Sequence, residues 1–478
     1  MCSGVHMRKK TLLEFMRKPK FYEELGCIDV TTDSCLLKAF LINEPKLIFG
    51  DGIQRNLPIE LRYVRRPYTY NEEIEAEYIV YYDKRDLRIR NLLKRFENGL
   101  IFWREKLHLD KYTLKVNLLS SDDPVNDALN EIKHPGREGI IIGAVISNKD
   151  DFLKLKAMGF VNKVKTHLLK RDKMISLSKN SKEFAMYLLN NIVQLYAKAN
   201  GIPWMLADVP LNPLPPTDIA IGFALTKVED KEDQKDRIPY YIASTFAVNI
   251  AGKEIKTIAL FTDVFTLDYE KYQTYGLYIP GRIVREIVSK VINIAKHYMS
   301  IKEPGRLFIY KTTVNTPEEI DVLNNMCGLR WRLVHMGLSG FRKRIYDLSS
   351  AEGCAPRGLA IYDTGIKELV LLTTGTIKYK TQKDVIAKSY GIGTPIPLRI
   401  NLDMQISDPK QYENELLFTA YQVLSLEKLD WESCTNWPKE TIIIKYARRL
   451  GELVKYMVSN VRRASTLGPI KGDIRYLM

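Results

Sequence analysis

The sequence contains few residues of the kinds that cross-link a chain or bind structural metals. It has 6 cysteines and 6 histidines among 478 residues, and no two cysteines form a Cys-x-x-Cys pair. Disulfide-stabilised scaffolds and zinc modules need such residues at higher density or at closer spacing. We therefore expect neither a disulfide framework nor a zinc site in this protein.

Long hydrophobic runs are also missing. The apolar run at residues 139–146 is much shorter than the roughly 20 residues that a membrane-spanning helix needs. The first residues of the chain lack the apolar core of a secretory signal. These absences predict a cytoplasmic protein that does not insert into a membrane.

The charge balance is strongly positive. Lys and Arg number 72 against 57 for Asp and Glu, so the formal net charge is +15. Such a balance favours a polyanionic partner, either nucleic acid or an acidic membrane surface, although an ordinary basic protein fits it equally well. The charges form short clusters, for example at 65–66, 163–173 and 462–463. Short clusters suit a folded groove better than a disordered basic tail.

Residues 77–199 show strand and helix patterns in alternation. Residues 139–147 are almost continuously apolar, which is typical of a buried strand in a parallel sheet. This alternation predicts a Rossmann-like α/β domain with helices on both faces of the sheet. The expected strands are 78–82, 112–119, 139–147 and 174–177, and the expected helices are 86–107, 124–132, 151–156, 162–170 and 182–199.

A proline-rich stretch separates this region from the rest of the chain, with prolines at 203, 210, 213, 215 and 216. Beyond it, three strand patterns precede a long amphipathic helix, which favours a mixed sheet of the ribonuclease-H type. These strands are expected at 219–226, 240–249 and 256–261, and the helix at 281–299, with later helices at 411–424 and 441–460. We therefore expect an N-terminal segment at 1–75, a first domain at 76–207 and a second domain at 208–478.

Several short stretches occur in the order found in one known protein family. They are the strand Asp218–Ala224, the strand Arg306–Val314, the segment Gln194–Trp204 that ends in Gly-Ile-Pro-Trp, and the helix start Lys445-Tyr-Ala-Arg448. On these residues the chain resembles a short prokaryotic Argonaute of archaeal type. The first domain is similar to a MID domain and the second to a PIWI domain, whereas residues 1–75 carry no such resemblance.

The resemblance implies a nuclease-like PIWI domain without its metal-binding carboxylates. Two-metal cleavage of a phosphodiester needs several carboxylates that hold two cations about 4 Å apart. At the positions where the family has its metal-binding residues, this chain has Ala224, Thr312 and Arg448. We therefore expect no catalytic residues and a protein that is not an enzyme.

The resemblance also implies a pocket for the 5′ phosphate of a guide strand in the MID-like part. A phosphate carries about two negative charges and several acceptor oxygens, so lysine ammonium groups suit it. Lys198 stands where the family has a lysine of this pocket, and Lys173 stands where it has a glutamine. Lys163 and Lys165 are further candidates. The family's C-terminal carboxylate, here that of Met478, can hold a divalent cation such as Mg²⁺ beside the guide phosphate.

The usual tyrosine of that pocket has no match. Phe152 and Lys156 have the four-residue spacing of the family's Tyr–Lys pair, but phenylalanine lacks the hydroxyl group. The loss of the tyrosine and the glutamine leaves open how the phosphate is held and whether the 5′ end is phosphorylated.

Three functions are compatible with this sequence. The first is guide-directed binding of nucleic acid, RNA or DNA, by a cleavage-dead Argonaute that activates a separately encoded effector protein in prokaryotic defence. The second is an active guide-dependent nuclease with atypical carboxylates. The third is a scaffold that binds nucleic acid nonspecifically. The acidic residues available for the second function are Asp218, Asp263, Asp268 (in a tyrosine-rich loop), Glu270 and Glu319.

Overall fold

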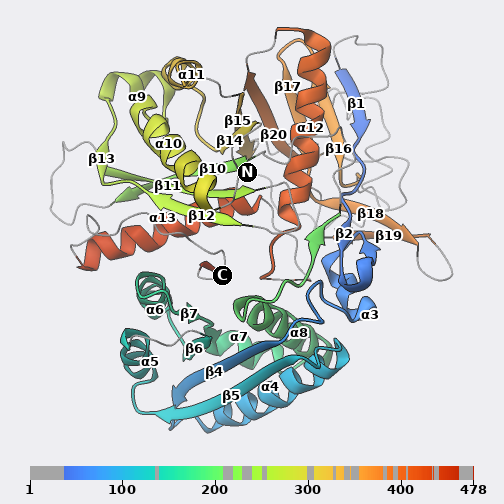
Figure 1. Ribbon diagram of the computed structural model, residues 1–478, viewed down its shortest axis with the longest axis vertical. Helices are drawn as coiled ribbons and strands as arrows, with labels where there is room; N and C mark the ends of the chain where they lie inside the picture. Colours follow the sequence, from blue (N-terminus) through green and yellow to red (C-terminus); the bar gives the residue numbers. More distant parts are fainter. Residues whose placement is uncertain are drawn as a thin grey trace, which may run out of the picture. The chain divides into compact units, whose positions relative to one another are not determined.

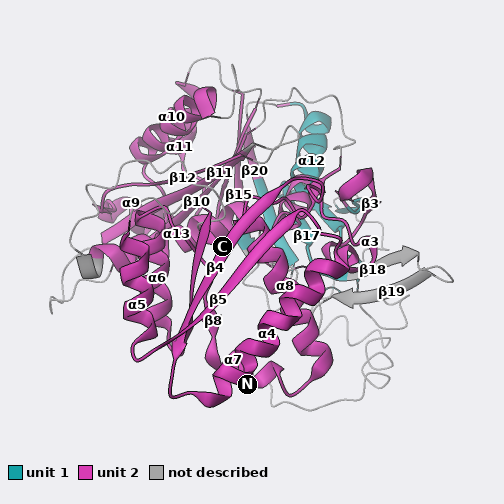
Figure 2. Cartoon of the chain, turned by 60° about the horizontal axis from the view of Figure 1, so that its bottom comes forward, with its two compact units in different colours: residues 1–44, 336–401, 408–421 teal, residues 45–335, 402–407, 422–478 magenta. Residues whose placement is uncertain are grey.

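The computed structural model shows a chain of mixed helices and strands (Figure 1). The chain forms two compact units (Figure 2). Unit 1 comprises residues 1–44, 336–401 and 408–421, and unit 2 comprises 45–335, 402–407 and 422–478. The structure describes residues 37–134, 139–207, 219–228, 240–249, 256–298, 306–326, 330–338, 345, 355–380, 385–390, 397–404, 407–432, 434, 441–461 and 477–478. Residues 1–36, the connection at 208–218 and Asp218 therefore lie outside the described residues.

The first sheet of unit 2 is parallel throughout, as the sequence predicts. Its strands have the order β5-β4-β6-β7, and β8 also pairs with β6. Strand β6 pairs with β4 on one side and with β7 and β8 on the other. Nearly all its residues are buried, as expected for a parallel strand that is covered on both faces. The strands are β4 (Ile74–Asp83), β5 (Tyr112–Ser121), β6 (Ile140–Ile146), β7 (Lys165–Thr166) and β8 (Leu169–Lys170).

Helices cover this sheet and begin at side chains that cap them. Asp86 accepts a hydrogen bond from the amide of Ile89 at the start of α4, and Asn180 caps α8 in the same way. Helices α5 and α6 pack on the sheet face that carries Ile79, Tyr81 and Ile142. The Rossmann-like expectation is thus confirmed. The helices are α4 (Leu87–Lys106), α5 (Pro124–Lys133), α6 (Lys149–Val161), α7 (Arg171–Leu177) and α8 (Ser181–Lys198).

Two of the expected elements in this part are wrong. The predicted helix at 162–170 is a turn followed by β7 and β8, because α6 ends at Val161 and Lys163 adopts a left-handed conformation with φ 56°. The predicted strand at 174–177 is the helix α7. A short apolar run fits a strand and a buried helix equally well, so its pattern could not separate the two.

The second sheet of unit 2 is mixed. Strands β10, β14 and β15 are parallel, whereas β11 and β12 continue antiparallel from β10, and β13 pairs with β11. The expectation of a ribonuclease-H-like core is confirmed. The strands are β10 (Ile219–Val228), β11 (Tyr240–Asn249), β12 (Thr257–Phe261), β13 (Phe265–Thr266), β14 (Leu307–Lys311) and β15 (Trp331–Leu338), of which the residues to His335 belong to unit 2.

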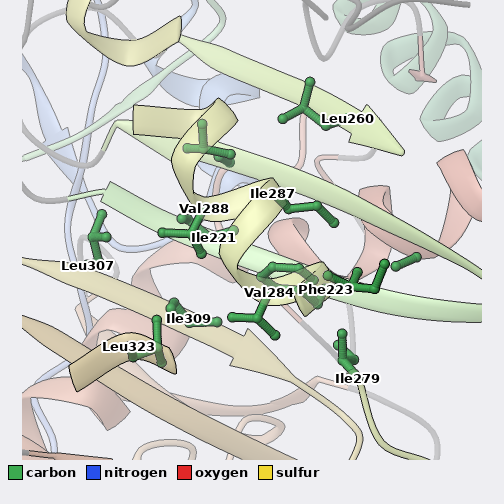
Figure 3. Close-up of a cluster of buried hydrophobic side chains, with 14 of the residues drawn as sticks. Ile221, Phe223, Leu260, Ile279, Val284, Ile287, Val288, Leu307, Ile309 and Leu323 are labelled. Atoms are coloured by element: carbon green, nitrogen blue, oxygen red, sulfur yellow. The ribbon is translucent and has the colours of Figure 1, made fainter. Parts of the chain in front are cut away.

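One face of this sheet carries a large apolar core (Figure 3). Ile221 and Phe223 of β10 meet Val284 and Ile287 of the helix α10 (Gly281–Tyr298), and Leu323 of α11 (Pro317–Asn324) joins them. Each such side chain contributes about 1.5–3 kcal/mol when it is fully buried. This core fixes the direction of β10, whose alternate residues must then face the opposite side.

The opposite face of β10 carries small residues such as Gly222 and Ala224, and a helix lies directly on it. A Cβ atom added to Gly222 would stand 2.5 Å from the main chain of Ile443 in α13 (Ile442–Val461). A Cβ atom on Gly451 of α13 would stand 2.1 Å from Thr226 Oγ1. Neither position has room for a side chain. Gly222 lets the backbones of β10 and α13 touch, and Gly451 lets the backbone of α13 rest on the side chains of Thr226 and Ser244.

Unit 1 contains an antiparallel set of strands in the order β1-β16-β17-β20. Within it, Arg357 donates to Glu44 at 3.1 Å, and Arg399 pairs with Glu368. Its elements are β1 (Leu37–Leu41), β16 (Leu359–Asp363), β17 (Glu368–Leu372), the hairpin β18 (Gly375–Lys380) and β19 (Val385–Tyr390), β20 (Pro397–Met404) and α12 (Pro409–Glu427). Strand β20 belongs to unit 1 as far as Asn401, and α12 as far as Tyr421.

The remaining elements of unit 2 are short. Strand β2 lies between β3 and β9 in a small antiparallel sheet. These elements are β2 (Leu47–Ile48), η1 (Gly50–Gly52), β3 (Gln54–Arg55), η2 (Pro58–Glu60), α3 (Leu61–Val64), β9 (Met205–Leu206) and α9 (Tyr269–Tyr275). In the described part of the chain, no helix is long and apolar enough to cross a membrane.

The close seating of α13 on β10 predicts that Gly451→Ala destabilises the protein. We expect a loss of about 1–3 kcal/mol from overpacking, which exceeds the helix-propensity gain of about 1 kcal/mol from replacing glycine. Chemical denaturation of the full chain measures it. Because Thr226 supplies the nearest atoms, Thr226→Ala combined with Gly451→Ala should cost less than the sum of the two single changes. A stabilising Gly451→Ala would contradict this packing.

Candidate anion-binding site around Met478

Lys198 is the last residue of α8 and is completely buried. Its Nζ donates a hydrogen bond of 2.6 Å to the main-chain oxygen of Met478. Lysine is almost never fully buried without a partner. The position that the sequence singled out is therefore not part of a solvated helix face, and its ammonium group points into the interior of unit 2.

A second buried lysine reaches the same oxygen. Lys156 of α6 is 4% exposed, and its Nζ donates to the main-chain oxygens of both Met478 and Thr166, the latter at 2.9 Å. The sequence suggested Lys156 only through its spacing from Phe152. A stronger indication that Lys156 is buried is its position between Leu155 and Ala157, which are both buried in α6.

Helix α13 adds an arginine to this cluster. Arg449 Nη1 donates to the main-chain oxygen of Leu477 at 3.4 Å and forms an ion pair with Glu432. Glu432 also accepts a hydrogen bond of 2.8 Å from Lys445, which pairs with Asp430 as well. We call Lys156, Lys198, Lys445, Arg449, Glu432 and Asp430 the Met478 cluster.

Burial disfavours the charged form of both lysines, and the nearby Glu432 only partly opposes this effect. Burial lowers the pKa of Lys156 to about 7, and the cation of Arg449 acts in the same direction. Burial, followed by the repulsion of Lys156, holds the pKa of Lys198 well below its usual value. An anion placed between them would reverse both effects, because an opposite charge within a few ångströms favours the protonated amine.

The acidic groups of the cluster already form ion pairs. Although burial opposes ionisation, the cations of Arg449 and Lys445 lower the pKa of Glu432. Burial raises the pKa of Asp430 despite its pairing with Lys445. Lys445 and Arg449 engage these two carboxylates, and the charge of Glu432 also acts on Lys156 and Lys198.

His167 borders the cluster as a neutral group. Burial and the nearby Lys198 lower the pKa of His167 to about 3. Its Nε2 lies 2.8 Å from Asn191 Oδ1, and its ring meets Tyr78 edge to face at 5.4 Å between centroids. His167 therefore supports the packing around Lys198 and adds no charge.

The other candidate lysines lie in different surroundings. Lys165 Nζ donates to Asn200 Oδ1 at 2.6 Å, and its charge acts on Lys198. Lys163 is exposed in the turn after α6. Lys173 lies in α7, where its Nζ stands 5.6 Å from the centroid of the Tyr187 ring. The structure thus brings Lys198 and Met478 together with Lys165 close by, whereas Lys163 and Lys173 have other surroundings.

The surroundings of Met478 do not fit Mg²⁺. The groups that reach its main-chain oxygen are two ammonium groups, which would repel a divalent cation. Among the described residues, no group of three His, Cys, Asp or Glu side chains could hold a metal ion. We therefore derive no role for Mg²⁺ in this cluster.

Ala224, Thr312 and Arg448, which the sequence resemblance sets at the family's metal-binding positions, lie within β10, directly after β14 and in α13. Phe223 of β10 pairs with Lys311, the last residue of β14, and β10 continues past Ala224 to Val228 beside β11. Ser244 Oγ donates to the main-chain oxygens of Ala447 at 2.6 Å and of Ala224 at 3.3 Å. The turn of α13 that carries Arg448 therefore lies against β10.

Of the acidic residues considered as substitute ligands, Asp218 lies outside the described residues, and the other four have the following surroundings. Asp268 caps α9, where the sequence suggested a loop, and Asp263 and Glu270 are exposed beside it. Glu319 is fully buried, pairs with Lys311, and forms a capping box with Thr316 at the start of α11.

Comparison with solved structures shows which known fold the chain resembles. Clostridium butyricum Argonaute, bound to a guide DNA and a 19-mer target DNA, superposes with a TM-score of 0.65 over 95% of this chain, at 15% identity. The Argonaute of A. aeolicus gives 0.57 over 92% at 14% identity, and Drosophila Piwi gives 0.55 over 87% at 14% identity. The chain has an Argonaute-like fold.

The likeness concerns the fold and part of the length. The chain spans 58% of the Clostridium butyricum Argonaute chain, 55% of the A. aeolicus chain and 54% of the Drosophila chain. No protein-family model matches the sequence, and a search of curated proteins gave no match. The Argonaute-like fold is thus visible in the structure at a sequence identity where whole-sequence comparison fails.

Proposed function

We propose that this protein binds a short guide strand and uses it to recognise a complementary nucleic acid without cutting it. The observation that carries the proposal is the convergence of two buried ammonium groups, those of Lys156 and Lys198, on one point. The Argonaute-like fold supports it, since the structure of Clostridium butyricum Argonaute contains a guide DNA and a target DNA.

The 5′ phosphate of the guide would bind at Lys156 and Lys198. A terminal phosphate has about two negative charges and three acceptor oxygens, which match two lysine amines and the amide groups around them. Its charge would raise the pKa of both amines toward their usual range and remove the repulsion between them.

Recognition of the target would then depend on base pairing. In guided systems the protein holds the duplex through its backbone and shape, while the guide supplies the sequence. The formal net charge of +15 favours such backbone contacts. Ala224, Thr312 and Arg448 offer no carboxylate at the vacated nuclease positions, which supports binding without cleavage.

A protein that binds without cutting needs a partner to produce an effect. We propose a separately encoded effector protein, in a prokaryotic defence response to invading nucleic acid. Guide and target would shift the complex between an idle and a triggered state, which requires that the effector bind one state better than the other. Residues 1–75 and exposed parts of the PIWI-like half are the expected contact surfaces.

One exposed surface of the PIWI-like half suits a protein better than a nucleic acid. Helix α9 buries none of its residues and exposes Tyr269, Tyr272 and Tyr275. The segment 262–278 has three acidic residues, at 263, 268 and 270, and one basic residue, at 271. This local excess of negative charge, in a chain of net charge +15, would repel a phosphate backbone. It fits a basic and apolar segment of the effector.

The phosphate assignment predicts that Lys198→Ala weakens binding of a 5′-phosphorylated strand by about 1–3 kcal/mol, the scale of a charge-assisted hydrogen bond. A 5′-hydroxyl strand should lose much less. Fluorescence titration with both strands measures the difference, and Lys198→Met tests whether a cavity causes the loss. Lys173→Ala is the control, because Lys173 contacts Tyr187. Equal losses for both strands would show a general structural role for Lys198.

The vacated positions predict no guide-directed cleavage. Guide-loaded protein, incubated with a labelled complementary strand and Mg²⁺ or Mn²⁺, should give no discrete product. Ala224→Asp should not restore cutting, since the two cations need several carboxylates together. A product cut opposite the middle of the guide would establish the active nuclease instead.

The partner assignment predicts that the protein purifies from its native cells in a stable complex. Replacing Tyr269 and Tyr272 with serine should release the effector while guide binding stays unchanged. Native-extract pull-down with mass spectrometry, and cell viability in the presence of invader nucleic acid, measure the two effects. Phe102→Ser, at an aromatic side chain that is 54% exposed on α4 in the MID-like part, is the control. Purification of the chain without a partner, together with protection that does not depend on neighbouring genes, would refute this assignment.

A further inference from the structure

One part of unit 2 combines an exposed aromatic ring with an excess of positive charge. The segment 61–70 contains arginines at 62, 65 and 66 and no acidic residue. Its Tyr63, in the short helix α3, is 67% exposed, more than any other large apolar or aromatic side chain among the described residues. The surface on α9 has the opposite sign of charge. A polyanion therefore suits the segment 61–70 better than a basic protein surface does.

One face of the Tyr63 ring is covered by a neighbouring cation. The guanidinium carbon of Arg62 lies 4.4 Å from the ring centroid, and Arg62 Nη2 donates to the Tyr63 hydroxyl group. Arg62 is itself half-buried, with its Nε atom enclosed. The ring is thus held by a fixed group on one side, and its exposed area lies mainly on the other. A flat aromatic face beside arginine is a surface on which nucleobases stack in proteins that bind single strands.

Arg65, two residues after Tyr63, supplies an available cation. It closes α3 in a left-handed conformation, with φ 59° and ψ 19°, which residues other than glycine rarely adopt. Its side chain is exposed and, within the part of the chain that the structure describes, forms no hydrogen bond, ion pair or ring contact. A guanidinium group is always protonated and donates to phosphate oxygens. Arg65 can therefore receive a phosphate beside a base that stacks on Tyr63.

The strained conformation of Arg65 is fixed by contacts on its C-terminal side. Arg66 forms an ion pair with Asp51, and its main-chain oxygen accepts a hydrogen bond of 2.9 Å from the amide of Gly50. The amide of Tyr68 donates to the main-chain oxygen of Pro203 at 3.0 Å. Strained residues persist where the surrounding contacts determine the backbone, and they concentrate at ligand-binding sites. These contacts therefore present the Arg65 side chain from a set position.

We propose that Tyr63 and Arg65 bind one unpaired nucleotide of the guide strand, with the base on the open face of Tyr63 and the adjoining phosphate on Arg65. Stacking needs only a π-face, so any base fits. A base has a free face only while it is unpaired, because a duplex places it between its neighbours. The site would therefore hold the guide before a target arrives and release that base on pairing. This inference rests on the proposed guide binding.

Guides with one missing base test the stacking contact. Purified protein, without an effector, is titrated with 5′-phosphorylated strands of RNA and of DNA that each carry one abasic position, placed in turn along the strand. With the wild type, one position or two adjacent positions should cost about tenfold in affinity. Tyr63→Leu should weaken the intact guide by a similar factor and show no further loss at that position, so that the two changes are not additive. Tyr63→Phe should bind as the wild type does.

A guide already paired with a fully complementary target gives a second readout. The Tyr63→Leu variant should bind this duplex with wild-type affinity, since no unpaired base remains to stack. A general folding defect would weaken both forms equally. The matched control is Tyr240→Leu at the start of β11, where the side chain is 37% exposed. This variant should keep the abasic profile of the wild type.

Two substitutions of Arg65 separate its charge from its backbone. Arg65→Gln removes the cation and keeps a side chain, whereas Arg65→Gly removes the cation and adopts φ 59° without strain. Both should lose about tenfold in guide affinity, and neither should lose more when the linkage beside the stacked base carries a neutral methylphosphonate. A loss with Arg65→Gln that Arg65→Gly does not show would overturn the phosphate contact. Arg285→Gln, at an exposed arginine of α10, is the charge control.

The outcomes separate this inference from the proposed function. A flat abasic profile with the wild type, or wild-type guide affinity of Tyr63→Leu, would overturn the site at Tyr63 and leave the selectivity of Lys198 for a 5′ phosphate standing. Failure of the wild-type protein to bind any guide would overturn the proposed function, and the stacking site with it.

Discussion

The backbone contact between α13 and β10 is the constraint on which the Met478 cluster depends. Gly222 and Gly451 remove the side chains that would keep the helix away from the strand. Because the two elements touch, consecutive residues of α13 have different surroundings. Arg449 reaches Glu432 and Leu477 in the Met478 cluster, whereas the neighbouring Arg448 is exposed. A shift of this helix would disturb the cluster.

The positive groups of α13 and of the Met478 cluster differ in burial. In the Met478 cluster the lysines are buried, so their protonation is costly and depends on what binds there. Arg448 of α13 is exposed and always protonated, so its charge is permanent.

The sequence predicted the regular elements well and the cluster only in part. Strands such as β6 and β10 and helices such as α8 have strong periodicity, and they appear within a few residues of their expected bounds. Helix α7 was missed because its apolar run is short. Lys156 was underrated because a lysine in a helix is ordinarily solvated. Its burial depends on Met478, more than 300 positions away, and no local pattern carries that contact.

Two amines buried against each other also make the unliganded fold incomplete in an energetic sense. Burial disfavours the protonated form of both lysines, so keeping them charged costs free energy that the folded state must supply. A ligand that binds only the folded chain returns that cost as added stability, in proportion to the logarithm of its concentration over its dissociation constant. The phosphate-bearing strand would thus act as a structural component of the protein, so that the chain is held in its folded form by the molecule it carries.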